Sequence, residues 1–104
     1  MGVFMSNAKQ VASTILNQLG GKRFCLMTGA KQLMALENGM TCKIGRNSSN
    51  ANYLKITVNS MDLYDMEFIR IHGSKMTTKK KITDVYCDQL QDIFTDVTGM
   101  YTSL

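Results

Sequence analysis

A change of apolar periodicity at Gly20-Gly21 divides this sequence of 104 residues into two unequal parts. Before the glycines, apolar residues recur every three or four positions, which places them on one stripe of an α-helix over about residues 7–20. Ser6 or Asn7 is the expected N-terminal cap, and the two glycines are expected to end the helix. After the glycines come short runs rich in Phe, Ile, Val, Tyr and Thr, which predict strands at residues 23–28, 32–37, 40–44, 53–58 and 64–71.

The dipeptide Asn38-Gly39 lies between two of these strands, and both of its residues accept positive φ angles. It therefore indicates a two-residue hairpin with a type I′ turn. Such a turn fixes the strand register, because each residue then has a defined partner across the ladder. The predicted pairs are Ala35 with Cys42 and Leu33 with Ile44 on one face, and Met34 with Lys43 and Leu36 with Thr41 on the other.

The next hairpin is decided by the sidedness of its strands. A five-residue loop over residues 59–63 places apolar residues opposite one another on one face and oppositely charged or polar residues on the other. A four-residue loop would instead set Asp65 opposite Ile56, so the longer loop is predicted. The predicted pairs are Ile56 with Met66, Leu54 with Phe68, Lys55 with Glu67 and Thr57 with Asp65.

The C-terminal third predicts one more strand and one more helix. Residues 75–81 indicate a short edge strand, whose lysines discourage pairing with another chain. A helix is expected from about Thr83, with Asp84 in its first turn and Gly99 at its end. Its apolar stripe consists of Tyr86, Leu90, Ile93, Phe94, Val97 and Tyr101, opposite Asp84, Asp88, Asp92 and Asp96. The sequence thus predicts one α+β domain over residues 1–104, with two layers, an antiparallel meander of about five strands, and N- and C-terminal helices on one face.

The sheet face that the helices leave uncovered is the first candidate site. The predicted registers give it a set of apolar residues beside Lys43 and Lys55, which is more apolar area than a monomer normally exposes to water. The candidate contact residues are Met27, Met34, Leu36, Tyr53 and Ile69. We therefore expect an interaction protein that binds another protein, or a second copy of itself, through this face. The alternative is that the registers are wrong by one residue or that the N-terminal residues cover the face.

The uneven distribution of charge gives the second candidate site. Residues 1–61 hold seven Lys or Arg and one acidic residue, whereas residues 82–104 hold four Asp and no basic residue. A sheet that combines cations with an aromatic ring can bind nucleic acid. The residues of this alternative are Lys43, Arg46, Lys55 and Arg70, with Tyr53 nearby. The run Lys79-Lys80-Lys81 is interpreted as a solvated approach to the last helix, with phosphate contact as its alternative.

The sequence offers little for catalysis or for metal binding. It has a single histidine, His72, and three widely spaced cysteines, Cys25, Cys42 and Cys87, which predict neither a zinc site nor a disulfide framework. No nucleophile and base share a recognisable motif, so we expect no enzymatic activity, no catalytic residues and no cofactor. No apolar run approaches the roughly 20 residues that a membrane helix requires, and the first residues do not form a signal peptide, which favours a cytoplasmic protein.

Four segments of the chain carry a resemblance to a known group. They are residues 17–21 (NQLGG), 27–31 (MTGAK), 62–65 (DLYD) and 98–104 (TGMYTSL). Together they resemble small uncharacterised proteins of tailed phages, prophages and related mobile elements, over nearly the whole chain from about Ala8. The resemblance implies the cytoplasm of a bacterial host cell and a host or phage protein as partner, and it brings no catalytic residues with it.

Overall fold

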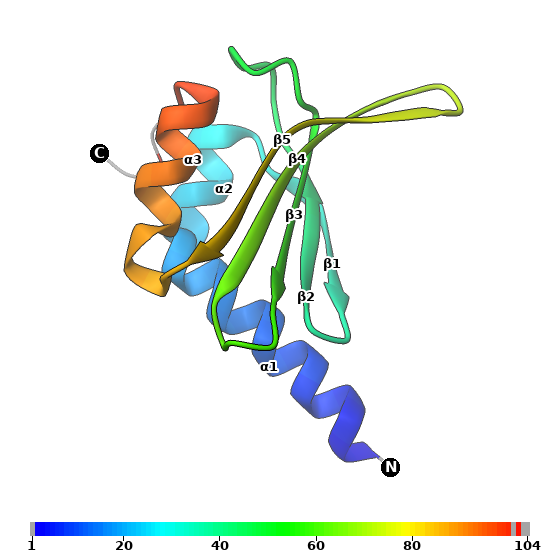
Figure 1. The fold of residues 1–104 in the computed structure, drawn as a ribbon, viewed down its shortest axis with the longest axis vertical. Coiled ribbons are helices and arrows are strands. Elements are labelled where there is room, and N and C mark those ends of the chain that lie inside the picture. The colour runs from blue at the N-terminus through cyan, green and yellow to red at the C-terminus, as the bar shows by residue number, and fades with distance from the viewer. Residues whose placement is uncertain (1, 101, 103–104) are drawn as a thin grey trace.

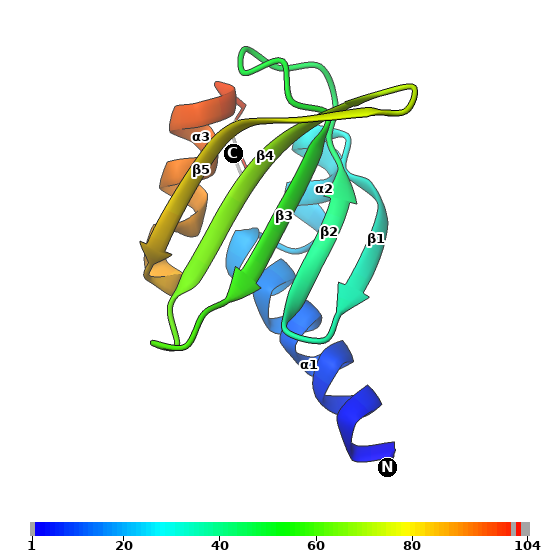
Figure 2. The ribbon, with the colours of Figure 1, turned by 45° about the vertical axis from the view of Figure 1, so that its right-hand side comes forward.

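Five consecutive strands form one antiparallel sheet, and three helices cover one of its faces (Figures 1 and 2). The computed structural model describes the backbone of residues 2–100 and 102, and side chains from residue 10 onward within those ranges. The strands are β1 (Lys31–Leu36), β2 (Gly39–Lys43), β3 (Tyr53–Val58), β4 (Tyr64–His72) and β5 (Lys75–Val85), in that order across the sheet. The helices are α1 (Gly2–Leu19), α2 (Lys22–Thr28) and α3 (Leu90–Thr98), with a 3₁₀ turn, η1 (Cys87–Gln89), before α3. The predicted two-layer α+β fold is confirmed.

Helix α1 ends where the sequence predicts and begins earlier. Gly20 and Gly21 follow it with φ angles of 124° and 61°, a conformation that side-chain-bearing residues resist. Its first residue is Gly2, so Ser6 and Asn7 lie inside the helix and the predicted N-terminal cap is wrong. Figures 1 and 2 show the N-terminal part of α1 extending beyond the sheet.

The segment predicted as the first strand is a helix. In α2, Phe24 and Thr28 are four residues apart and both are buried, and the Thr28 hydroxyl donates a 2.6 Å hydrogen bond to the Phe24 carbonyl. Gly29, in the left-handed conformation with φ of 69°, ends this helix after seven residues. The prediction was wrong because apolar periodicity does not distinguish so short a helix from a strand.

The hairpin of β1 and β2 has a different turn and register from those predicted. Glu37 and Asn38 form the turn, while Gly39 belongs to β2 and pairs with Leu36. The register moves by two residues, so Met34 pairs with Thr41 and each side chain keeps its predicted face. The physical reason is the neighbouring strand: a Cβ at Gly39 would lie 2.0 Å from the carbonyl oxygen of Ile56 in β3. Gly39 therefore permits close strand contact rather than a type I′ turn.

The hairpin of β3 and β4 has the predicted loop and the predicted register. All four pairs are confirmed: Ile56 with Met66, Leu54 with Phe68, Lys55 with Glu67 and Thr57 with Asp65. The side chain of Asn59 organises the loop, because its Oδ1 accepts hydrogen bonds from the N–H groups of Met61 and Leu63.

Strand β5 is longer than predicted and includes the start of the expected helix. Val85 is buried and pairs with Tyr64, which keeps residues 83–85 in the sheet. Asp84 has φ of 58° at an irregularity of this ladder, and its Oδ1 accepts a 2.9 Å hydrogen bond from Asn59. The helical part therefore starts after Tyr86, and Gly99 ends α3 as predicted, with its N–H bonded to the Thr95 carbonyl. Tyr101 lies outside the described residues.

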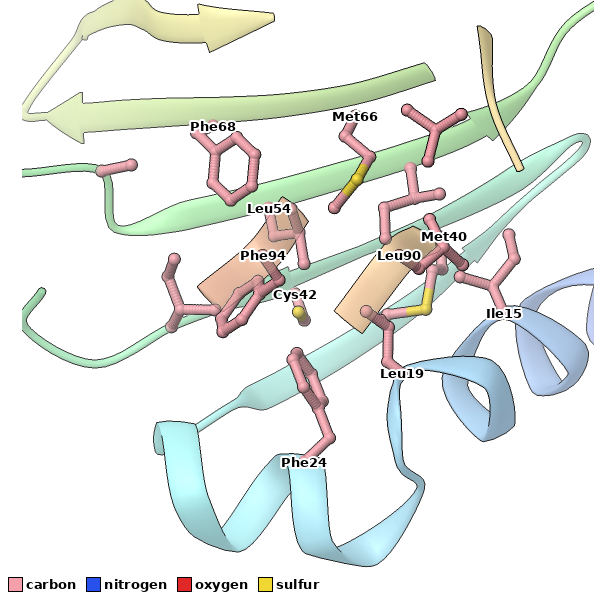
Figure 3. Close-up of a cluster of buried hydrophobic side chains, with 14 residues drawn as sticks. Ile15, Leu19, Phe24, Met40, Cys42, Leu54, Met66, Phe68, Leu90 and Phe94 are labelled. Atoms are coloured by element: carbon pink, nitrogen blue, oxygen red, sulfur yellow. The ribbon is translucent and has the colours of Figure 1, made fainter. Parts of the chain in front are cut away.

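The core lies between the sheet and the helices and is built around three phenylalanines (Figure 3). The rings of Phe24 and Phe94 meet edge to face, with centroids 5.1 Å apart, and Phe68 lies 6.1 Å from Phe94. These rings join α2, α3 and β4 in one cluster. The remaining fully buried apolar residues are Ile15, Leu19, Met40, Cys42, Leu54, Ile56, Met66, Val85 and Leu90.

Candidate functional site

The face of the sheet opposite the helices is more cationic than the sequence predicts. Two adjacent rows of paired residues cross it: Lys31, Lys43, Tyr53 and Ile69 in one, and Thr41, Lys55, Glu67 and Lys81 in the other. Glu67 is the acidic residue of these two rows, and its carboxylate lies 4.0 Å from the Lys55 ammonium group. Because both side chains are partly exposed, this ion pair adds little stability. The other three lysines of the two rows leave the face with an excess of positive charge.

The predicted apolar contact surface on this face is smaller than expected. Met34 is 58% exposed, and Leu36 and Tyr53 are half-buried. Ile69 is buried, with 7% of its surface exposed, and Met27 lies on α2 in the helical layer. Of the five predicted residues, Met27 does not belong to the sheet face and Ile69 is not accessible for contact. The reason for Met27 is the helical conformation of residues 22–28, whereas Ile69 lies on an inner strand with Tyr53 and Thr78 as its partners on either side.

The end of the hairpin formed by β4 and β5 continues beyond the sheet. Strand β3 pairs with β4 only as far as Tyr53 and Ile69, whereas β4 and β5 remain paired up to His72 and Lys75. We call residues 70–78 the arm. Figures 1 and 2 show its tip standing clear of the other elements.

The arm and the residues that follow it are exposed and basic. Every residue from 72 to 81 is exposed, and this segment contains Lys75, Lys79, Lys80 and Lys81. No Asp or Glu occurs between Glu67 and Asp84. The arm is not apparent from the sequence, because residues 75–81 have the pattern of an ordinary edge strand. The sequence feature that indicates the basic region is the long stretch without Asp or Glu between Glu67 and Asp84.

At the root of the arm, two of the predicted cations come together. Arg46 and Arg70 line the same open hollow, of about 560 Å³, with the polar loop of residues 45–52 on one side. The Arg70 guanidinium donates a 3.1 Å hydrogen bond to the Asn50 carbonyl. Lys43 and Lys55 lie instead on the open sheet face, so the four predicted residues fall into two groups.

The loop beside these arginines is fixed by its own amides. Asn47 donates hydrogen bonds to the carbonyls of Gly45 and Ala51, at 2.8 and 2.7 Å. The side chain of Asn52 bonds both backbone groups of Ile71 at 2.8 Å, one as donor and one as acceptor. These two hydrogen bonds extend the pairing of β4 from Ile69 to Ile71, just beyond the first residue of β3, Tyr53.

A second hollow, of about 460 Å³, lies on the other side of the same loop, between β5 and α3. Lys79, Lys80, Ser49 and Asp96 line it, over an apolar floor of Ile82, Ile93 and Val97. The ladder of β4 and β5 is irregular here, with Phe68 opposite Lys80 and Ile69 opposite Thr78, so Lys79 is an extra residue. A bulge of this kind redirects side chains, which accounts for two consecutive lysines lining one hollow.

The row of aspartates is shorter than predicted. Asp88 lies in η1, and Asp92 and Asp96 lie in α3, all exposed, whereas Asp84 lies in β5. Asp96 shares the hollow of Lys79 and Lys80, so the basic and acidic regions of the molecule meet at this point. The remaining aspartates form a solvated helix face.

The three cysteines differ in exposure, and their reactivity should differ accordingly. Cys42 is buried, Cys25 is half-buried and Cys87 is exposed. Burial, with a smaller effect from Cys25, raises the pKa of Cys42 to about 12. At pH 8 we expect iodoacetamide to alkylate Cys87. It should modify Cys42 more slowly by a factor of roughly 100 or greater, because the thiolate is the reactive form. Peptide mass spectrometry over time measures both rates, and alkylation of Cys42 as fast as Cys87 would contradict the burial described here.

The raised pKa of Cys42 also sets a direction for stability at high pH. Below pH 9 the thiol is protonated in both the folded and the unfolded chain. Between pH 9 and 12 the unfolded chain loses this proton while the folded chain keeps it, so stability falls as the pH rises through this window.

Other functional groups are spread over the fold. His72 is exposed near the tip of the arm, and Asp65 accepts a hydrogen bond from Asn59. Within residues 2–100 and 102, no three His, Cys, Asp or Glu side chains gather in a way that could hold a metal ion. In the same part of the chain, no helix is long and apolar enough to cross a membrane.

Comparison of the chain with models of protein families, with curated proteins and with solved structures gave no match in any of the three. The features of the molecule that bear on function are therefore the arm, the two hollows at its root and the open sheet face.

Proposed function

We propose that this chain is a non-enzymatic protein that binds double-stranded DNA through the arm and the cations at its root. The observation that carries the proposal is the exposed arm together with the residues that follow it: residues 72–81 bear four lysines, and residues 68–83 include no acidic residue. A two-stranded ribbon fits the major groove of B-form DNA, which is about 12 Å wide, and lysines along it can contact phosphates.

The composition of the arm favours a duplex over a single strand. Proteins that bind single strands use aromatic rings on which successive bases stack. No Phe, Tyr or Trp occurs between Phe68 and Tyr86, and the ring on the open sheet face, Tyr53, is half-buried. Contact with phosphates along a duplex requires cations and shape; the arm supplies the shape, and the arm with residues 79–81 supplies the cations.

The root of the arm extends the same charge. Arg46 and Arg70 line one hollow, and Lys79 and Lys80 line the other, so the loop of residues 45–52 contributes one cation and has three more beside it. This arrangement would steer a polyanion toward the arm. The bacterial cytoplasm that the resemblance to phage proteins implies would place the arm near chromosomal or phage DNA.

The salt dependence of binding tests this proposal. With about four phosphate contacts, a plot of log K against log salt concentration should have a slope of about −4 for a 25-base-pair duplex. The triple variant Lys75→Gln, Lys79→Gln, Lys80→Gln should reduce the size of this slope by two to three, because each contact contributes about 0.9. Fluorescence anisotropy of labelled duplex DNA between 50 and 300 mM salt measures both slopes.

The matched control removes exposed cations that lie away from the arm. Lys22→Gln with Arg23→Gln alters two exposed residues of α2 and should leave the slope unchanged. Absence of duplex binding at 50 mM salt, or tighter binding of a single strand of equal length, would refute the proposal. If a pull-down from nuclease-treated bacterial lysate then captured a host or phage protein, the interpretation as a protein-binding module would replace it.

A further inference from the structure

The arm has two unlike faces, and from their difference we propose that duplex DNA lies against the face that continues the helix side of the sheet. This assignment of the contact surface rests on the proposed function. Side chains of a strand alternate between its two faces, so residues two apart share a face. Phe68 lies in the core against Phe94 of α3, on the helix side. Arg70 and His72, two and four residues further along β4, therefore lie on the helix side as well.

Pairing across the arm assigns the residues of β5 to the same two faces. The pairs are consecutive from Ile69 with Thr78 to His72 with Lys75, and the irregularity of this ladder lies before them. Directly paired residues point to the same face. One face, which we call the basic face, has four exposed polar residues, whereas the other is uncharged. The basic face consists of Arg70, His72, Lys75 and Thr77, and the other of Ile69, Ile71, Met76 and Thr78.

The cations at the root of the arm lie beside the basic face. Lys80 pairs with Phe68, and Lys79 and Lys80 both line the hollow between β5 and α3, which is on the helix side. Arg46 shares its hollow with Arg70, a residue of the basic face. A duplex that follows the basic face to its root therefore meets five cations, Arg46, Arg70, Lys75, Lys79 and Lys80.

The other face of the arm offers little to a polyanion. Its residues carry no charge, and Met76 among them is 70% exposed. This face continues the open sheet face, where Lys81 pairs with Glu67 and the Glu67 carboxylate lies 4.0 Å from the Lys55 ammonium group. Because phosphate contacts require cations, a duplex that contacts the arm finds them on the basic face.

Two neighbouring threonines test which face the duplex contacts. Thr77 and Thr78 are both exposed and adjacent in β5, and they point to opposite faces of the arm. Thr77→Glu places a carboxylate among the cations of the basic face and should weaken binding of a 25-base-pair duplex on the order of tenfold at 50 mM salt. Thr78→Glu makes the same change in net charge and should weaken binding about twofold or less. Fluorescence anisotropy measures both affinities, and urea denaturation shows that both variants are folded.

Removal of a carboxylate tests the same assignment through a gain of affinity, which unfolding does not produce. Asp96 lines the hollow of Lys79 and Lys80, whereas Glu67 lies on the open sheet face. Asp96→Asn should raise the affinity for the duplex about two- to threefold at 50 mM salt and by less at 300 mM, because salt screens the repulsion. Glu67→Gln is the matched control and should leave the affinity unchanged.

The outcomes separate this inference from the function on which it rests. Equal losses for Thr77→Glu and Thr78→Glu would overturn the assignment of the face, as would a gain for Glu67→Gln as large as that for Asp96→Asn. In either case the wild type still binds duplex DNA, so the proposed function stands. If the wild type binds no duplex at 50 mM salt, both proposals fail.

Discussion

Phe94→Ala should lower the free energy of unfolding by about 3–5 kcal/mol, which is a large part of the stability of a domain of this size. The Phe94 side chain is fully buried and lies between Phe24 of α2 and Phe68 of β4. Its removal leaves a cavity where the helical layer meets the sheet, and the lost ring contacts affect both layers. Urea denaturation followed by circular dichroism measures the change.

The matched control for this prediction is Tyr86→Ala. Tyr86 is also aromatic and directly precedes the C-terminal helical segment, but it is 59% exposed, so its removal should change the stability by no more than about 0.5 kcal/mol. Equal losses for the two variants would mean that Phe94 does not join the helices to the sheet as described.

Gly39→Ala should destabilise the protein by about 3 kcal/mol, although it adds only one methyl group. The new Cβ would lie 2.0 Å from the Ile56 carbonyl oxygen and 2.8 Å from the Thr57 Cα, and both are backbone atoms that cannot rotate away. Strands β2 and β3 must therefore separate at this point, which weakens the centre of the sheet. Urea denaturation reports the loss.

Gly73→Asn is the control that separates close contact from glycine conformation. Gly73 has φ of 61°, but a Cβ there would meet no atom within 4 Å, and Asn tolerates the left-handed conformation. We expect a loss of less than about 1 kcal/mol. If Gly39→Ala were as mild as Gly73→Asn, the close approach of β2 and β3 at Gly39 would be disproved.

The parts of the fold that depend on local pattern were predictable from the sequence. The register of β3 and β4 followed from sidedness, because a loop one residue shorter would set Asp65 opposite Ile56. The ends of α1 and α3 followed from Gly20 and Gly99, whose positive φ angles few other residues adopt.

The errors arose where distant contacts outweigh local preference. Asn38-Gly39 is a strong turn signal, yet the passage of β3 requires glycine inside β2, so the turn moves to Glu37 and Asn38. Thr83 and Asp84 suit a helix start, but the pairing of Val85 with Tyr64 keeps them in β5. Neither the approach of β3 to Gly39 nor the pairing of Val85 with Tyr64 can be predicted from the residues next to them in the sequence.

The candidate site was predictable only in part. The charge distribution identified Arg46 and Arg70, which line one hollow, and it placed Lys43 and Lys55 on the open face. The charge distribution did not show that β4 and β5 extend beyond the end of β3, because the length of a strand depends on its pairing with other strands. The basic arm is a consequence of that difference in length.

The amide of Asn52 has a mechanical consequence for the arm. It holds Ile71 with two hydrogen bonds at the point where the five-stranded sheet becomes a two-stranded ribbon. A ribbon of two strands takes a larger twist than a wide sheet, since no third strand constrains it. Asn52 thus fixes the residue of β4 at which the ribbon leaves the sheet, and beyond Ile71 only the pairing of β4 with β5 sets the ribbon's direction.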